Sequence, residues 1–168
     1  MDLGHGYGRL NLALLVVGLA LSGGACQAAP PLSSPPSEGQ AREFLGTVVE
    51  LAGAGRFEEL CALGASNCDR FLEQAGRDAP VEAPTVVGTR VIQPQVSGDA
   101  RITGGRVLEL CGRRGDGIYY SEMLVFNEGG QLRAIEPIYW SGMEIADDAT
   151  TGDSSVDDAA RCAEAGFD

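Results

Sequence analysis

Residues 106–126 read RVLELCGRRGDGIYYSEMLVF, two runs of apolar, β-branched and aromatic side chains on either side of a short polar segment. Side chains of these types favour extended backbone. The dipeptide Asp116-Gly117 inside the polar segment is typical of a tight hairpin turn. The stretch therefore predicts an antiparallel hairpin with strands over 106–111 and 118–126.

Two more extended segments flank this hairpin. Residues 85–93 read TVVGTRVIQ, and residues 132–140 read LRAIEPIYW. The connection NEGG before the last segment is short, so we expect the strands from 106 onward to form an antiparallel meander. Pro137 cannot donate to a ladder, which indicates that the last strand is an edge strand or a bulged one.

Helical patterns come before these strands. Ser37 and Gln40 fit a capping box, and Gly53 or Gly55 would end the helix through a left-handed C-cap. The apolar residues between them fall on one helical face, namely Ala41, Phe44, Leu45, Val48 and Ala52. Two shorter helices are expected over 56–63 and from Asn67 onward. Helices followed by a sheet indicate an α+β fold rather than α/β.

This order of elements resembles the cystatin-like cone of the nuclear-transport-factor-two-like superfamily. The segments GRFEELCAL at 55–63 and NEGGQLRAI at 127–135 look most like it. The resemblance implies N-terminal helices packed on a curved, four-stranded antiparallel sheet. It implies no single function, because this fold hosts isomerases, dehydratases and non-catalytic binding domains.

The first residues have the layout of a secretory signal peptide. An apolar run over 10–21 follows Arg9, and small residues precede Cys26. The run is shorter than the roughly 20 residues that a membrane-spanning helix needs. Residues 23–26, GGAC, resemble a bacterial lipobox, which implies lipidation of Cys26 and cleavage before it. Ordinary cleavage after Ala28, with release of the protein, is the alternative.

Composition divides the rest of the chain. We expect a lipoprotein signal peptide over 1–25, a Pro/Ser-rich tether over 26–37, a globular domain over 38–145 and an acidic tail over 146–168. From Glu144 onward eight acids face a single arginine, a composition typical of a solvated tail. A disulfide inside the tail would instead hold part of it on the domain.

The number of cysteines is consistent with an exported protein. If Cys26 carries lipid, an even set remains, Cys61, Cys68, Cys111 and Cys162, and exported proteins tend to pair their thiols. We expect a local Cys61–Cys68 bond and a long Cys111–Cys162 bond that folds the tail back over the strand at 106–111. Four cysteines permit three connectivities, and the sequence does not exclude the other two.

Charge restricts the partners. The net charge is −12, and all twelve basic residues are arginine, a usage typical of GC-rich bacteria. Such a chain is unsuited to nucleic acid or anionic lipid, which require a basic patch. The expected partners are the membrane, through a lipid anchor on its extracytoplasmic face, and a cell-envelope protein; a secreted protein is the alternative location.

Catalysis would have to proceed without histidine. The only one, His5, belongs to the segment that we expect to be removed, so histidine triads and histidine metal sites are excluded from the mature protein. A carboxylate base with a tyrosine electrophile remains possible, as in ketosteroid isomerase, which is a known example of that chemistry. The residues of the right type near the strands are Glu109, Tyr119, Tyr120, Glu122 and Glu136.

Tyr120 and Glu122 would share one face of their strand. If that face is enclosed, burial would raise the pKa of Glu122; if it faces water, Glu122 is a surface charge, which is what we expect. Tyr139 and Trp140 could stack on a ligand or close the core. These four residues are the candidate ligand-binding set.

The sequence as a whole predicts a non-catalytic domain that binds a protein partner or a small apolar ligand, with no catalytic residue, cofactor or metal. A small isomerase or dehydratase of the same fold is the alternative, as is an inhibitor of a secreted enzyme.

Overall fold

The computed structural model describes residues 34–64, 68–97, 100–102, 104–146, 151–153 and 158–167. All of them belong to the unit Pro31–Asp168, one of two into which the chain divides. The expected signal peptide and the lipidation site Cys26 lie outside the described residues. No helix in the described ranges is long and apolar enough to span a membrane.

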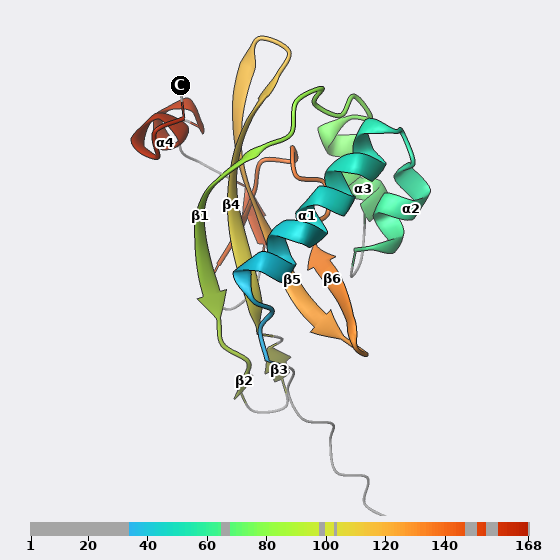
Figure 1. Cartoon of the computed structure of the whole chain (residues 1–168), viewed down its shortest axis with the longest axis vertical. Helices are drawn as coiled ribbons and strands as arrows, with labels where there is room; N and C mark the ends of the chain where they lie inside the picture. The colour runs from blue at the N-terminus through green and yellow to red at the C-terminus, as the bar shows by residue number, and fades with distance from the viewer. Residues whose placement is uncertain are drawn as a thin grey trace, which may run out of the picture. The chain divides into compact units, whose positions relative to one another are not determined.

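The helices precede a four-stranded antiparallel sheet, so the α+β class is confirmed (Figure 1). Three helices lie at the start and one at the end: α1 (Glu38–Gly53), α2 (Phe57–Ala62), α3 (Cys68–Ala75) and α4 (Asp158–Glu164). The sheet has the order β1-β4-β5-β6 and consists of β1 (Thr85–Ile92), β4 (Gly105–Arg114), β5 (Gly117–Glu128) and β6 (Gln131–Ile135). The curved-cone detail of the resemblance remains a prediction.

Two small hairpins were not predicted. One pairs β2 (Gln95–Ser97) with β3 (Ala100–Ile102), between the first two strands of the main sheet. The other pairs β7 (Met143–Ile145) with β8 (Thr151–Asp153) after the main sheet. Strands of three residues are too short to give a clear alternation of apolar and polar side chains.

Helix α1 begins and ends where the sequence predicts. The Ser37 hydroxyl accepts from the Gln40 backbone N–H at 3.2 Å, and the Gln40 side chain accepts from the Ser37 N–H at 2.9 Å. The chain leaves the helix through Gly55, whose φ of 68° is the left-handed conformation that favours glycine. The five residues predicted for the core face, Ala41, Phe44, Leu45, Val48 and Ala52, are all buried.

The central hairpin is longer than predicted, and its register fixes which side chains share a face. Pairing runs from Arg114↔Gly117 at the turn to Arg106↔Val125 at the far end. Alternate residues of β5 then point to opposite sides of the sheet. Met123 and its alternate neighbours join the core beneath the helices, whereas residues such as Tyr120 face the other side.

Both faces of the sheet are covered. On one face α1 lies across the strands, and its apolar side packs on Leu108 and Met123 (Figure 1). On the other face Ile145 of β7 packs on Leu124, and Cys162 of α4 packs on Tyr120. An antiparallel sheet often leaves one face to water, but here the C-terminal segment covers much of the second face.

Strand β6 is an edge strand, as predicted, but it ends at Ile135. Glu136 has a φ of 62°, and Pro137 has no N–H to donate, so the ladder stops there. Tyr139 and Trp140 therefore lie in the turn after the strand and not, as predicted, within it.

The structure contains both expected disulfides. Cys61–Cys68 joins α2 to α3 with Cα atoms 5.3 Å apart, and Cys111–Cys162 joins β4 to α4 with Cα atoms 5.7 Å apart. The expectation of a wholly solvated tail is therefore wrong for residues 158–167, which form α4 and the turn after it. The long bond holds this helix on the sheet, and the Cys162 side chain is fully buried.

Candidate functional site

Glu122 lies at the centre of a buried polar cluster and is only 5% exposed. The two terminal nitrogens of Arg90 donate to its two carboxylate oxygens at 2.9 and 3.0 Å. The Tyr120 hydroxyl donates to the same carboxylate at 2.7 Å, and so does the Ile145 backbone N–H. The expectation that Glu122 is a surface charge is therefore wrong, because the C-terminal segment encloses this face.

The hydrogen bonds of this cluster determine its protonation states. Burial acts to raise the pKa of Glu122, but the bonds from Arg90, Ile145 and Tyr120 together hold that pKa below its ordinary value. The conditional prediction of a raised pKa in an enclosed site is thus wrong. Burial and the neighbouring carboxylate raise the pKa of Tyr120. Glu122 is therefore ionised and Tyr120 protonated, and both carboxylate oxygens of Glu122 are already occupied by donors of the chain itself.

Two further contacts tie the C-terminal segment to the cluster. The Arg161 guanidinium of α4 lies 4.1 Å from the centre of the Tyr120 ring and pairs with Glu144 of β7. Arg90 also donates to the Ile145 carbonyl. The cluster therefore connects β1, β5, β7 and α4, which makes it a structural clamp.

The other two candidate ligand-binding residues lie on the opposite, helix-covered face. Tyr139 is fully buried and Trp140 is 3% exposed, and their rings meet edge to face with centroids 4.8 Å apart. The Trp140 indole N–H donates to the Gly76 carbonyl at 3.1 Å. The predicted set of four is thus divided between two sides of the sheet and does not form one site.

Glu136 is the most unusual acid in the described part of the chain. It is 2% exposed, and its left-handed backbone precedes a proline, a combination that is sterically disfavoured. One carboxylate oxygen accepts from the Ile138 N–H at 3.1 Å, and the other has no hydrogen-bond partner among the described residues. Burial raises the pKa of Glu136 to about 8, which the Ile138 N–H and Arg70 only partly oppose.

Other polar atoms on this face share that lack of partners. Within the described residues, the hydroxyl groups of Tyr119, Ser121 and Tyr139 are buried without a hydrogen bond. The rings of Tyr119 and Tyr139 lie 6.4 Å apart. A neutral carboxyl group is chemically able to donate a hydrogen bond to a bound oxygen. The sequence feature that could have indicated the buried Glu136 is a glutamate followed by proline within an otherwise apolar run.

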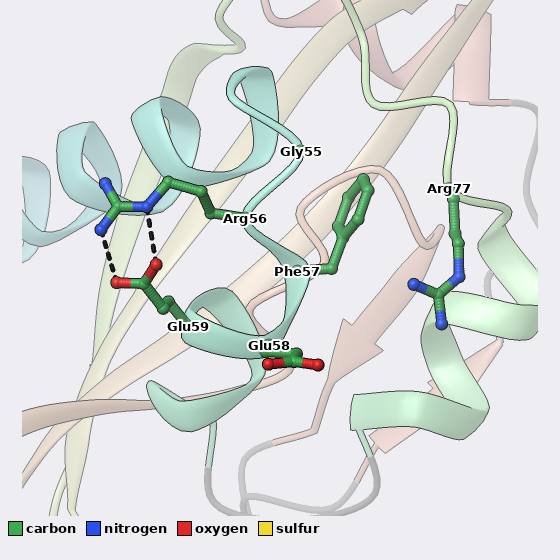
Figure 2. A pocket seen from close by; sticks show the side chains of 6 residues that line it. All are labelled: Gly55, Arg56, Phe57, Glu58, Glu59 and Arg77. Atoms are coloured by element: carbon green, nitrogen blue, oxygen red, sulfur yellow. Dashed lines mark hydrogen bonds and ion pairs between the residues drawn. The ribbon is translucent and has the colours of Figure 1, made fainter.

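Hollows on the surface occur at a different place, around the turn between α1 and α2. One of about 310 Å³ is lined by Arg56, Phe57 and Arg77 (Figure 2). Arg56 is paired with Glu59 there at 2.7 Å, and the Arg77 guanidinium lies 5.7 Å from the centre of the Phe57 ring.

Two neighbouring hollows of about 400 Å³ each extend this region. One lies between α1 and α2, over Leu51 and Leu63, and the other lies between Phe57 and Val81. Sequence analysis missed this surface, because it arises from the angle between two helices and a loop and not from a motif.

The described residues contain no group of three or more His, Cys, Asp or Glu side chains that could hold a metal ion. No family model, curated protein or solved structure matches the chain. The superfamily resemblance therefore stays a prediction, and the function has to be inferred from the geometry described above.

Proposed function

We propose that the chain is exported, is anchored to the extracytoplasmic face of the membrane through lipid on Cys26, and presents a domain that binds another cell-envelope protein without catalysing a reaction. Cysteine pairing supports the first part. Four of the five cysteines form disulfides, which persist in oxidising compartments. Cys26 is the one left over, and it is the residue in the lipobox-like sequence.

The observation that carries the binding role is the filled interior. The candidate residues on both faces of the sheet, Tyr120, Glu122, Tyr139 and Trp140, are at most 5% exposed, and their surroundings are the chain's own side chains. A ligand held by these residues would have to displace native packing. A partner that meets the outer surface requires no such rearrangement, so we favour a protein partner over a small apolar ligand.

A small isomerase or dehydratase is the second candidate, and Glu136 is the observation in its favour. A carboxyl group with a pKa raised to about 8 has the protonation behaviour of a general acid near neutral pH. Its 2% exposure weighs against this role, since a substrate must reach the acid.

The anchoring proposal is tested by replacing Cys26 with Ser and, as a matched control, Ala28 with Leu. The first change removes the acyl acceptor, and the second blocks only ordinary cleavage after Ala28. We expect the wild type and Ala28→Leu to fractionate with membranes and to carry an acyl mass, and Cys26→Ser to lack it. A wild type found in the medium without acyl mass, with Ala28→Leu retained as precursor, would show a secreted protein instead.

The binding proposal is tested by reversible cross-linking in intact cells, followed by mass spectrometry of the purified protein. We expect adducts that are heavier than the mature chain alone and contain a second envelope protein. Recovery of the uncross-linked chain alone, at all cross-linker concentrations that link known envelope complexes, would contradict a binding role.

A further inference from the structure

The hollows described above converge on one corner of the helical layer. We call this corner the α1–α2 groove and define it by Leu51, Phe57, Leu63, Arg77 and Val81, which come from α1, α2 and the segments that follow α2 and α3. The chain leaves α1 through Gly55 and enters α2 at Phe57, and the first hollow lies at this turn (Figure 2).

The groove exposes apolar surface at its rim. Val81 is fully exposed, at 103% of its reference area, and the Phe57 ring is only partly buried. One exposed valine is ordinary on a protein surface. Val81 lines the same hollow as the Phe57 ring, and two further hollows adjoin it. This combination suits contact with a partner, because binding sites combine a concave surface with apolar side chains at their centre.

The residues that line the hollows carry a net negative charge, with four acids, Glu50, Glu58, Glu59 and Asp78, against two bases, Arg56 and Arg77. Residues 38–82 contain nine acids, all exposed, and four arginines, a net charge of −5. Arg56 is already paired with Glu59. Glu50, Glu58 and Asp78 line the hollows, and none of them has an ion pair among the described residues.

This charge selects among possible occupants. A second copy of the chain carries the same net charge of −12 and the same acidic helices, so self-association through this face would bring like charges together. Nucleic acid and anionic lipid are repelled for the same reason. A segment with several basic residues and an apolar side chain fits both the charge and the hollows.

We propose that the α1–α2 groove docks a basic, partly apolar segment of the envelope protein that this domain binds. The inference rests on the proposed binding function and adds its surface and the chemistry of its partner. The apolar side chain of the partner lies between Phe57 and Val81, and its basic residues face Glu50, Glu58 and Asp78.

The test places the photo-cross-linking residue p-benzoylphenylalanine at Val81 in the full chain in its native cells. A matched control places it at Glu128, the last residue of β5, whose side chain is 63% exposed. Both positions are on the surface, so neither variant disturbs the core. We expect an adduct from Val81 whose captured peptide has a net positive charge, and at most a trace from Glu128.

The possible outcomes distinguish an error in the proposed docking surface from an error in the proposed binding function. An adduct from Glu128 alone would overturn the groove and leave the binding function standing. Adducts from neither position would overturn both. Capture of a neutral or acidic segment, or of a second copy of this chain, would overturn the stated partner chemistry.

The charge requirement is tested with Glu58→Lys in the Val81 cross-linking chain. Reversing one charge at an interface rim weakens association and slows it, so we expect the adduct yield to fall by up to about fivefold, the factor that corresponds to an exposed ion pair of about 1 kcal/mol. Glu43→Lys is the control, because it makes the same change at an exposed site of α1 outside the three hollows. Equal yields from the two variants would overturn the role of charge at the groove.

Discussion

Replacing Glu136 by Gln is the most informative single change, because the two side chains have nearly the same shape and only one of them can ionise. Glutamine keeps a carbonyl oxygen able to accept from the Ile138 N–H, the bond that Glu136 makes at 3.1 Å. The variant therefore removes the titration without opening a cavity. We expect it to be more stable than the wild type at alkaline pH and nearly equal to it at acidic pH.

The sign follows from the direction of the pKa shift. Burial raises the pKa of Glu136 from 4.5 to about 8, so the folded protein keeps a proton that the unfolded chain releases. The contribution of Glu136 to stability is then fully present below pH 4.5, is lost as the pH rises towards 8, and stays absent above that. Raising the pKa from 4.5 to about 8 corresponds to a loss of roughly 5 kcal/mol at most, since each tenfold change in proton affinity is worth about 1.4 kcal/mol.

The assay is urea unfolding with the disulfides intact, on the Cys26→Ser form, at a series of pH values from about 4 to about 9. Trp140 is the only tryptophan and is 3% exposed, so its fluorescence reports the transition. The difference between variant and wild type should grow with pH by a few kcal/mol. Parallel stability curves across this range would refute the reasoning, because they would show that Glu136 titrates alike in both states.

Three further changes test the fold by the same unfolding measurement at neutral pH. Glu122→Gln should destabilise by about 3 kcal/mol, because it leaves Arg90 short of its buried partner; a loss below about 0.5 kcal/mol would argue against the clamp. Replacing Cys111 and Cys162 together by Ala should cost about 4 kcal/mol, since the bond closes a loop of 51 residues, and unchanged stability would mean that the bond is absent. Gly55→Ala should cost about 1 kcal/mol, because its φ is 68°, and a gain in stability would contradict the left-handed cap.

Local features were predictable from the sequence. The capping box at Ser37 and the glycine stop at Gly55 depend on residues within one or two turns of each other, and both appear as expected. The strand over 118–126 was recognised from its composition, although β5 extends from Gly117 to Glu128. Local patterns identified the core of each element better than its ends.

The environment of Glu122 was not predictable in the same way. Its partner Arg90 is 32 positions away in the sequence, and the Ile145 N–H is 23 positions away in the other direction. Whether that face of the sheet meets water depends on where the chain goes after β6. A period-two pattern shows which residues share a face but not what covers it.

Covering that face also determines where a partner can bind. The clamp around Glu122 uses Arg90 and Arg161, two of the twelve basic residues, to neutralise acids inside the fold. The four arginines of residues 38–82 remain outnumbered by nine acids. Residues 83–168 carry a larger excess, with fourteen acids and seven arginines, so both parts of the domain are acidic. Charge therefore attracts a basic partner to the domain as a whole, and the hollows with their apolar lining are what select the α1–α2 groove as its docking site.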